Sequence, residues 1–402
     1  MLWRALILVM VAVVVSVCSM PQDGVESRFI SIRRIIDTII SAGFPVEVHD
    51  VTTEDGYVLA MHRIPYGRSG PTAERRPVVF LMHGVMSASS HFVSLGADHS
   101  IAFNLADAGY DVWMGNARGN AYSRSHVSLN PDDSSEKMDF FDFSWEEIAL
   151  IDLPAMIDFA LAHTGQQKLH YIGHSQGGTV FLVLNSMKTE YNEKIASAHL
   201  LAGVGYMANF PNAPLRTIAA MTTPIYALLL SMGLVEISLD ALPILLPNDG
   251  QKASDYCFGD IKYQAFCDMI GIDIILEDSI IFALEMGGSS IKQIAHYGQN
   301  IKDQAFRRWD HGIIRNRIIY GSITPPSYDI SKITIDVTMH YSLGDILLDE
   351  RDVLAMAAVM PNTVPRQISR ASFLHVDYIA SSDVKELVTD YIIEKLDAAE
   401  GR

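Results

Sequence analysis

Cysteine is scarce in this chain of 402 residues, which has three, at Cys18, Cys257 and Cys267. They form no cluster with histidine at the spacing of a zinc site, so we predict no bound metal. The chain also lacks any Asn-x-Ser/Thr sequon, so N-linked glycosylation is not expected.

Positive charge is in short supply as well. The chain has 30 Lys and Arg residues against 47 Asp and Glu residues, and its formal net charge is −17. Broad electrostatic binding to nucleic acid or to an anionic membrane is therefore not expected. Binding to neutral lipid stays open, because it does not depend on attraction between charges.

The first residues lack the length of a transmembrane helix. The apolar run Ala5–Val17 has 13 residues, whereas spanning a bilayer takes about 20. Arg4 precedes this run and the small residues Cys18 and Ser19 follow it, which is typical of a secretory signal peptide. We predict a signal peptide at 1–19, no stable transmembrane anchor, and secretion to the extracellular space or a gut lumen. Lysosomal delivery and an uncleaved anchor are the alternatives.

Export bears on the two remaining cysteines. Cys257 and Cys267 lie ten positions apart, and an oxidising compartment favours a disulfide between them. Closing so short a loop is expected to stabilise the fold by about 2–3 kcal/mol. Two unpaired thiols are the alternative.

The rest of the chain has the pattern of an α/β fold. Short apolar runs at 77–82 and 109–114 are typical of buried strands, and helical patterns alternate with them. This alternation predicts a mostly parallel sheet with helices on both faces. Residues 46–63 read as a hairpin with a turn at 54–56. Ser144 begins a capping box, and Asp152 is placed to cap a second helix after it.

The alternation fails between residues 207 and 325 and then resumes. We therefore expect a helical insertion over the sheet, which divides the chain into a signal peptide at 1–19, a core in two parts at 20–206 and 326–402, and a helical cap at 207–325. Within the cap, Pro224–Leu246 is rich in Leu, Ile and Met. A lid that moves and a static pair of packed helices both fit this segment.

The run Lys168–Val183 carries the clearest chemical signal. A strand-like segment leads into Gly173-His174-Ser175-Gln176-Gly177, and a helix-like apolar segment follows. Gly-x-Ser-x-Gly between a strand and a helix is the layout of a nucleophile elbow, in which a sharp turn exposes the serine hydroxyl. It predicts acyl transfer through a serine ester.

A serine hydroxyl needs a histidine to remove its proton and an acid to orient that histidine. In α/β hydrolases the order along the chain is serine, acid, histidine. His375 is the one histidine after Ser175 in a loop beyond the last strand, and Asp345 follows the strand that ends at Tyr341. Two other carboxylates could serve as the acid instead of Asp345. They are Asp349, which could cap the next helix, and Asp352.

The oxyanion formed during such a reaction needs two backbone N–H donors. One is expected at Gln176, directly after the serine at a helix start, where the helix dipole favours negative charge. The other is expected at Val85, in the loop after the 77–82 strand, where Gly84 lets the backbone approach closely.

Several stretches of this chain share their residues with one family. They are 43–49, 55–57, 63–65, 81–84, 109–120, 143–145, 152–155 and 173–177. The chain resembles the acid lipase family, which includes gastric and lysosomal acid lipases and their insect digestive relatives. The resemblance covers nearly the whole chain after the signal peptide.

The resemblance implies an α/β-hydrolase core with a helical cap and lid. It also implies hydrolysis of neutral lipid esters (triacylglycerols, sometimes cholesteryl esters) at a lipid–water interface without a cofactor. Position by position, it implies the catalytic triad Ser175, Asp345 and His375, the oxyanion donors Val85 and Gln176, and a bridge between Cys257 and Cys267 near the lid.

The chain departs from the family pattern at Phe141, where tryptophan is common, and at Met286–Ser290, where Pro-Ala-Gly-Thr-Ser is more usual. These departures leave the substrate open. A carboxylesterase or phospholipase on the same fold is the first alternative. A non-catalytic lipid-binding or storage protein is the second, and the presence of all three triad residues argues against it.

Overall fold

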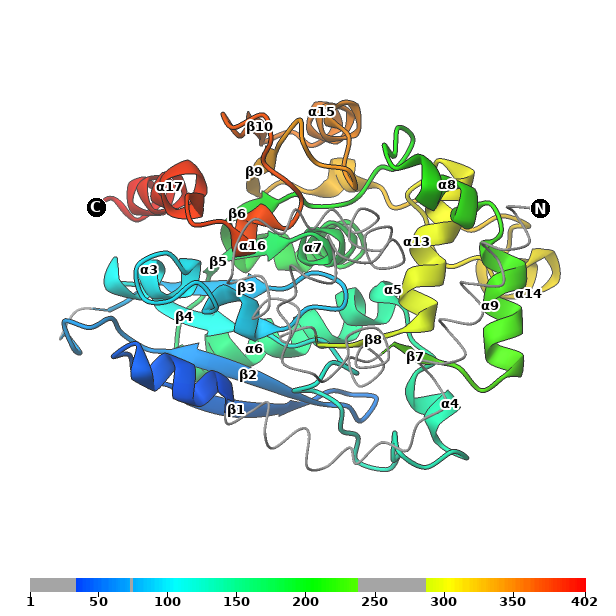
Figure 1. The fold of residues 1–402 in the computed structure, drawn as a ribbon, viewed down its shortest axis with the longest axis horizontal. Coiled ribbons are helices and arrows are strands. Elements are labelled where there is room, and N and C mark those ends of the chain that lie inside the picture. Colours follow the sequence, from blue (N-terminus) through cyan, green and yellow to red (C-terminus); the bar gives the residue numbers. More distant parts are fainter. Residues whose placement is uncertain (1–33, 73–74, 238–286) are drawn as a thin grey trace, which may run out of the picture.

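The computed structural model describes residues 34–72, 75–237 and 287–402. A sheet with the strand order β1-β2-β4-β3-β5-β6-β9-β10 runs through its middle (Figure 1). Its strands are β1 (Glu47–Thr52), β2 (Val58–Ile64), β3 (Val78–Met82), β4 (Asp111–Met114), β5 (Leu169–His174), β6 (Ile195–Leu201), β9 (Asp336–Tyr341) and β10 (Thr363–Gln367). The pairings β1–β2 and β2–β4 are antiparallel and the others are parallel, so the prediction of a mostly parallel sheet is confirmed.

Burial of the strands follows from their place in the sheet. Every residue of β3, β4 and β5 is buried, as expected of central strands covered on both faces. The edge strand β1 instead alternates between exposed and half-buried residues over most of its length. It forms the predicted hairpin with β2, whose turn places Gly56 at a φ of 99°.

Helices cover both faces of the sheet. The main ones are α3 (Ile101–Asp107), α4 (Lys137–Phe140), α5 (Trp145–Glu147), α6 (Leu153–Thr164), α7 (Gln176–Met187), α15 (Glu350–Val359), α16 (Asp377–Ala380) and α17 (Asp390–Glu400). α6 and α7 contact each other and the central strands, whereas α3 contacts β2 and β4, and α17 contacts β6.

One local expectation is wrong. The capping box at Ser144 forms as predicted, but Asp152 does not cap a second helix. The helix continues from α5 into α6 through a π-helical turn at Ile148–Asp152. The Asp152 carboxylate instead accepts hydrogen bonds from Arg118, at 2.9 Å from the backbone N and 2.7 Å from Nε. Asp152 is fully buried, so this charged partner outweighs the local capping preference.

Between β6 and β9 the described chain is helical. This part contains α8 (Ala213–Ala219), α9 (Thr222–Ser231), α13 (Ile291–Asp303), α14 (Ile313–Tyr320) and the short strand pair β7 (Glu236–Ile237) and β8 (Ser289–Ser290). α13 packs against α8 and α9, and all four helices lie together at the right of Figure 1. No described helix could by itself cross a bilayer, although α8 and α9, bent by 63° at their junction, reach the required length and apolar content as a pair.

Several predictions fall outside the described residues. These are the signal peptide at 1–19, the disulfide between Cys257 and Cys267, and residues 238–246 of the proposed lid at Pro224–Leu246. They stay predictions, as does the division of the chain into core and cap.

Several histidines are buried in the interior. Burial lowers the pKa of His296 and His199 to about 3 and that of His62 to about 4. The His296 ring stacks on Trp145 with centroids 3.8 Å apart, and its Nε2 donates to the Arg307 carbonyl at 3.0 Å. These side chains are therefore neutral in the folded protein at pH values where they are charged in the unfolded chain.

The sign of the resulting pH dependence follows directly. Between the lowered folded pKa and the unfolded value of 6.5, the unfolded state binds more protons. The free energy of unfolding should therefore fall as pH decreases through this window. In His296→Gln, whose amide can still donate to the Arg307 carbonyl, we expect this slope to decrease by up to about 1.4 kcal/mol per pH unit.

Urea unfolding at a series of pH values measures this slope. His99→Gln is the matched control, because His99 is exposed and its loss should leave the slope as in the wild type. Equal slopes for His296→Gln and the wild type would contradict the assignment of a neutral buried imidazole.

Candidate active site

Ser175 lies in a sharp turn between β5 and α7. Its backbone has φ 52° and ψ −112°, a conformation rare for a residue with a side chain. A Cβ added at Gly173 would lie 2.5 Å from the carbonyl carbon of Gly177, and one added at Gly177 would lie 2.2 Å from the carbonyl oxygen of Met82. The turn therefore requires both glycines of the motif, because the strand, the helix and the end of β3 approach too closely for any side chain there.

The structure brings the three predicted triad side chains together. His375 Nε2 lies 2.8 Å from Ser175 Oγ, and His375 Nδ1 lies 2.8 Å from Asp345 Oδ2. Asp345 stands in the loop after β9 and His375 in the loop before α16. All three residues are more than nine-tenths buried. The geometry is that of a nucleophile, a base and a residue that orients the base.

Asp345 is held by its own loop. Its Oδ1 accepts hydrogen bonds from the backbone N–H groups of Leu347 and Leu348 at 2.7 and 3.0 Å, which leaves Oδ2 for the imidazole. The rival carboxylates point elsewhere: Asp349 caps α15 through the N–H of Arg351, and Asp352 accepts from Asn209.

We expect Asp345→Asn to lower kcat for a dissolved ester by about 10³- to 10⁴-fold, because an amide disfavours the tautomer that the histidine needs. Asp349→Asn is the matched control and should keep wild-type activity, since asparagine is an equally good helix N-cap. Comparable losses in the two variants would contradict the assignment of Asp345.

His174, inside the motif, contacts the backbone of the triad histidine. Its Nε2 lies 2.9 Å from the carbonyl oxygen of His375. Burial, followed by the nearby His375, lowers the pKa of His174 to about 3, so the ring is neutral and donates through Nε2. A residue adjacent to the nucleophile in the sequence thus fixes the loop that carries the base, a positioning role that the motif alone did not reveal.

Replacing His174 tests this positioning role. His174→Leu should lower kcat for a dissolved ester by roughly 10- to 100-fold with little change in KM, because a base displaced from the nucleophile slows the chemical step. His174→Gln, whose amide can donate to the same carbonyl, should recover part of the loss. A rise in KM at constant kcat, or no recovery in the glutamine variant, would contradict this role.

The two predicted oxyanion donors flank the serine. Gln176 is the first residue of α7, where a backbone N–H has no acceptor within the helix. Val85 follows Gly84, and a Cβ added at Gly84 would lie 3.1 Å from Ser175 Cβ. Neither the Val85 nor the Gln176 N–H donates to another described residue. The role of these two N–H groups in binding an oxyanion stays a prediction.

His83 organises the loop after β3, a role missed in the sequence. Its Nδ1 donates to the Gly84 carbonyl at 2.7 Å, and its Nε2 accepts from the N–H of Ala117 at 3.1 Å and from the Asn120 amide at 3.2 Å. Burial lowers the pKa of His83 to about 4, which suits this neutral tautomer. The signal that could have revealed this role is the run 109–120, because Ala117 and Asn120, the hydrogen-bond donors to His83, lie in it.

The same loop is hydrogen-bonded to Gly287, which precedes β8. Met86, at φ 58°, accepts a hydrogen bond through its carbonyl from the Gly287 N–H at 2.9 Å, and the Gly287 carbonyl accepts from the Ala121 N–H at 2.6 Å. A Cβ added at Gly287 would lie 2.3 Å from the Ser87 carbonyl oxygen. Gly287 lies in the stretch 286–290 that departs from the family pattern, and a close backbone contact thus requires a glycine there.

One group of side chains away from this site resembles a set of metal ligands. Ligand atoms of Glu47, His49 and His163 lie within 4.8 Å of one another. The Arg63 guanidinium already lies among them, with Nη1 2.8 Å from Glu47 and 3.2 Å from His163 Nε2. A fixed positive charge at that position does not fit a cation site.

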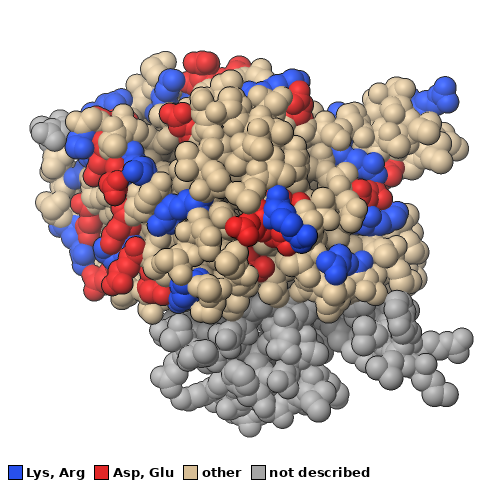
Figure 2. Space-filling model, turned by 90° about the horizontal axis from the view of Figure 1, so that it is seen from above, with Lys and Arg blue, Asp and Glu red and all other residues tan. Residues whose placement is uncertain are grey.

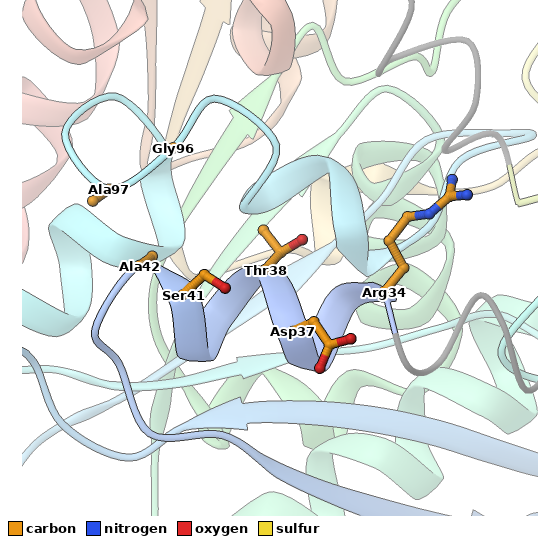
Figure 3. Close-up of a pocket in the computed structure, with 7 residues that line it drawn as sticks. All are labelled: Arg34, Asp37, Thr38, Ser41, Ala42, Gly96 and Ala97. Atoms are coloured by element: carbon orange, nitrogen blue, oxygen red, sulfur yellow. The ribbon is translucent and has the colours of Figure 1, made fainter.

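A surface hollow of about 820 Å³ lies beside the helix at residues 34–41 (Figure 3). Its lining residues are Arg34, Asp37, Thr38, Ser41, Ala42, Gly96 and Ala97. None of the predicted catalytic or oxyanion residues lines this hollow, so we assign it no part in catalysis.

Comparisons with known proteins agree with this fold. Residues 35–96 match the family model described as a partial alpha/beta-hydrolase lipase region, and residues 77–222 match the alpha/beta hydrolase fold. Among solved structures, that of DcsB in complex with its substrate analogue aligns with a TM-score of 0.52 and 12% identity, covering 87% of this chain and 98% of DcsB. At that identity the likeness shows the fold alone. The protein is an α/β hydrolase.

The closer comparisons give the family. The chain is 37% identical to Lipase 3 of Drosophila melanogaster, over 89% of this chain and 91% of that protein. It is 35% identical to lipase lipl-1 of Caenorhabditis elegans, over 88% and 90%, and 31% identical to human gastric triacylglycerol lipase, over 88% of each. The chain belongs to the acid lipase family and is an ester hydrolase.

Proposed function

We propose that this protein is a secreted lipase that hydrolyses neutral lipid esters through an acyl-enzyme on Ser175. The observation that carries the proposal is the hydrogen-bonded chain from Ser175 through His375 to Asp345, with both contacts at 2.8 Å. The names of the gastric relatives support triacylglycerol as substrate. Cholesteryl ester, which has the same ester chemistry, is a second candidate substrate.

The proposed reaction has two steps. His375 Nε2 removes the proton from Ser175 Oγ as the oxygen attacks the ester carbonyl, and Asp345 stabilises the imidazolium that forms. The N–H groups of Val85 and Gln176 stabilise the oxyanion. His375 then protonates the departing alcohol, and the fatty acyl group stays on Ser175.

Water completes the cycle. His375, neutral again, removes a proton from a water molecule that attacks the acyl-enzyme, and the second oxyanion uses the same two donors. Its collapse releases the fatty acid and returns the proton to Ser175 Oγ.

The proposal extends to the setting of the reaction. The helices α8, α9, α13 and α14 gather at one side of the sheet (Figure 1), which supports a cap at 207–325 over a core formed by 20–206 and 326–402. Substrate then reaches the site at a lipid–water interface. The N-terminal sequence supports secretion, with lysosomal delivery as the alternative.

Replacement of the nucleophile tests the chemistry. We expect Ser175→Ala to lower kcat by about 10⁶-fold and to abolish labelling by a fluorophosphonate, because alanine has no hydroxyl to form the ester. Ser128→Ala, at an exposed serine, is the matched control and should keep both activities. Labelling that persists in Ser175→Ala would refute the assignment of Ser175.

The substrate class needs its own measurement, made by pH-stat titration of the fatty acid released. We expect turnover of emulsified triacylglycerol, and higher turnover there than on dissolved short-chain esters. Cleavage of dissolved esters alone would favour a carboxylesterase, and release of fatty acid from phospholipid alone would favour a phospholipase.

A further inference from the structure

The short helix α14 presents an unusual surface. Isoleucines are normally buried, yet four of its eight residues are exposed isoleucines, and a fifth exposed isoleucine follows the helix. They are Ile313, Ile314, Ile318, Ile319 and Ile323. Single exposed apolar residues need no explanation, but five exposed isoleucines within eleven residues of one short segment point to an interaction surface.

The helix is held at its inner face by polar contacts. Asn316 is fully buried, and its amide donates to Asp310 Oδ1 at 2.6 Å and to the Ile323 carbonyl at 3.1 Å. Tyr320, one turn later, donates to the Trp309 carbonyl at 2.9 Å. The isoleucines are therefore not exposed by fraying, because the helix that carries them is fixed to the body of the protein.

Helical geometry sets the outer face. At 100° per residue, Ile314 and Ile318 lie opposite the buried Asn316 and the half-buried Tyr320. They are also the most exposed isoleucines of the helix, at 78% and 79%. The same rotation places Arg317 on one side of this apolar ridge and Arg315 on the other, and both arginines are exposed.

The charge of this region opposes that of the whole chain. The protein has a formal net charge of −17, yet no acidic residue occurs between Gly312 and Tyr328, where two arginines do. An apolar ridge between two arginines suits a lipid surface that carries anionic headgroups, because the ridge enters the acyl region while the guanidinium groups stay at the headgroup level. Fatty acid released by ester hydrolysis supplies such negative charge when ionised.

Contacts connect this helix to the active site. Asp310, which binds Asn316, exchanges hydrogen bonds with Gln299 of α13 at 2.9 and 3.1 Å. The Tyr297 hydroxyl of α13 lies 2.9 Å from the Thr179 hydroxyl, with which it forms a hydrogen bond. Thr179 lies in the first turn of α7, the helix that begins directly after Ser175. Figure 1 places α14 at the same side of the molecule as α9 and α13, and Figure 2 shows a largely tan projection at that side.

We propose that α14 docks the enzyme on the surface of a neutral-lipid particle that carries anionic amphiphiles. Ile314 and Ile318 enter the lipid, and Arg315 and Arg317 contact anionic headgroups. The proposal rests on the proposed lipase function, but it concerns binding to the lipid surface and not the chemical step.

The test measures binding without hydrolysis, in the full-length Ser175→Ala protein. Flotation with triolein emulsions coated with phosphatidylcholine, with or without phosphatidylglycerol, gives the partition of protein to lipid. The double variant Ile314→Asn/Ile318→Asn should bind both emulsions at least about tenfold more weakly. Val127→Asn/Val364→Asn, at two exposed valines elsewhere, is the matched control and should bind as its parent does.

The arginines are tested separately. Arg315→Gln/Arg317→Gln should weaken binding to the phosphatidylglycerol emulsion by roughly fivefold for each arginine and leave binding to the uncharged emulsion unchanged. Added salt should remove that difference. Equal binding of this variant and its parent to the anionic emulsion would overturn the role of the arginines.

Other results would overturn the proposal as a whole. One is partition of the isoleucine variant equal to that of the valine control. Another is a wild-type dimer that becomes a monomer in the isoleucine variant with unchanged flotation, since α14 would then join two copies of the chain. With Ser175 intact, the isoleucine variant should hydrolyse dissolved esters normally; an equal loss there would mark a structural role. If the proposed function fails instead, the wild type hydrolyses no ester while flotation still responds to α14.

Discussion

The backbone turn at Ser175 is the constraint on which the rest of the site depends. Its positive φ aims the serine hydroxyl at His375, and such a conformation costs on the order of 1–3 kcal/mol. The close approach of Gly173, Gly177 and the end of β3 holds the turn in place. Because β3 and β5 are buried along their whole length, the core around the turn supplies the packing that offsets this strain.

Neutral histidines complete the support of that turn. His83 ties the loop that carries Val85 to the chain after β4, and His174 ties the nucleophile strand to the loop that carries His375. Each uses one ring nitrogen as a donor, which requires a fixed tautomer. Burial keeps both rings neutral by lowering the pKa of His83 to about 4 and that of His174 to about 3. The loops on both sides of the serine are thus fixed by groups that carry no charge near the reacting atoms.

Residue order and local pattern predicted most of the fold and the triad. The elbow, the hairpin and the choice of Asp345 each depend on a short segment or on chain order, and Asp349 indeed caps α15. Contacts between distant residues could not be predicted. His174 is hydrogen-bonded to a carbonyl 201 positions away in the sequence. Asp152 pairs with Arg118, 34 positions away, although its position at the start of a helix favours capping. The isoleucines of α14 have the composition of a buried helix, and only the structure shows that they are exposed.

The backbone hydrogen bond between Gly287 and Met86 limits which residues position 287 can accept. The Gly287 N–H donates to the Met86 carbonyl at 2.9 Å, and Met86 lies in the loop that carries Val85. A side chain there would collide with the Ser87 carbonyl and displace that loop. Substitution at position 287 would therefore move the loop that carries Val85, although Gly287 is not itself one of the proposed catalytic residues.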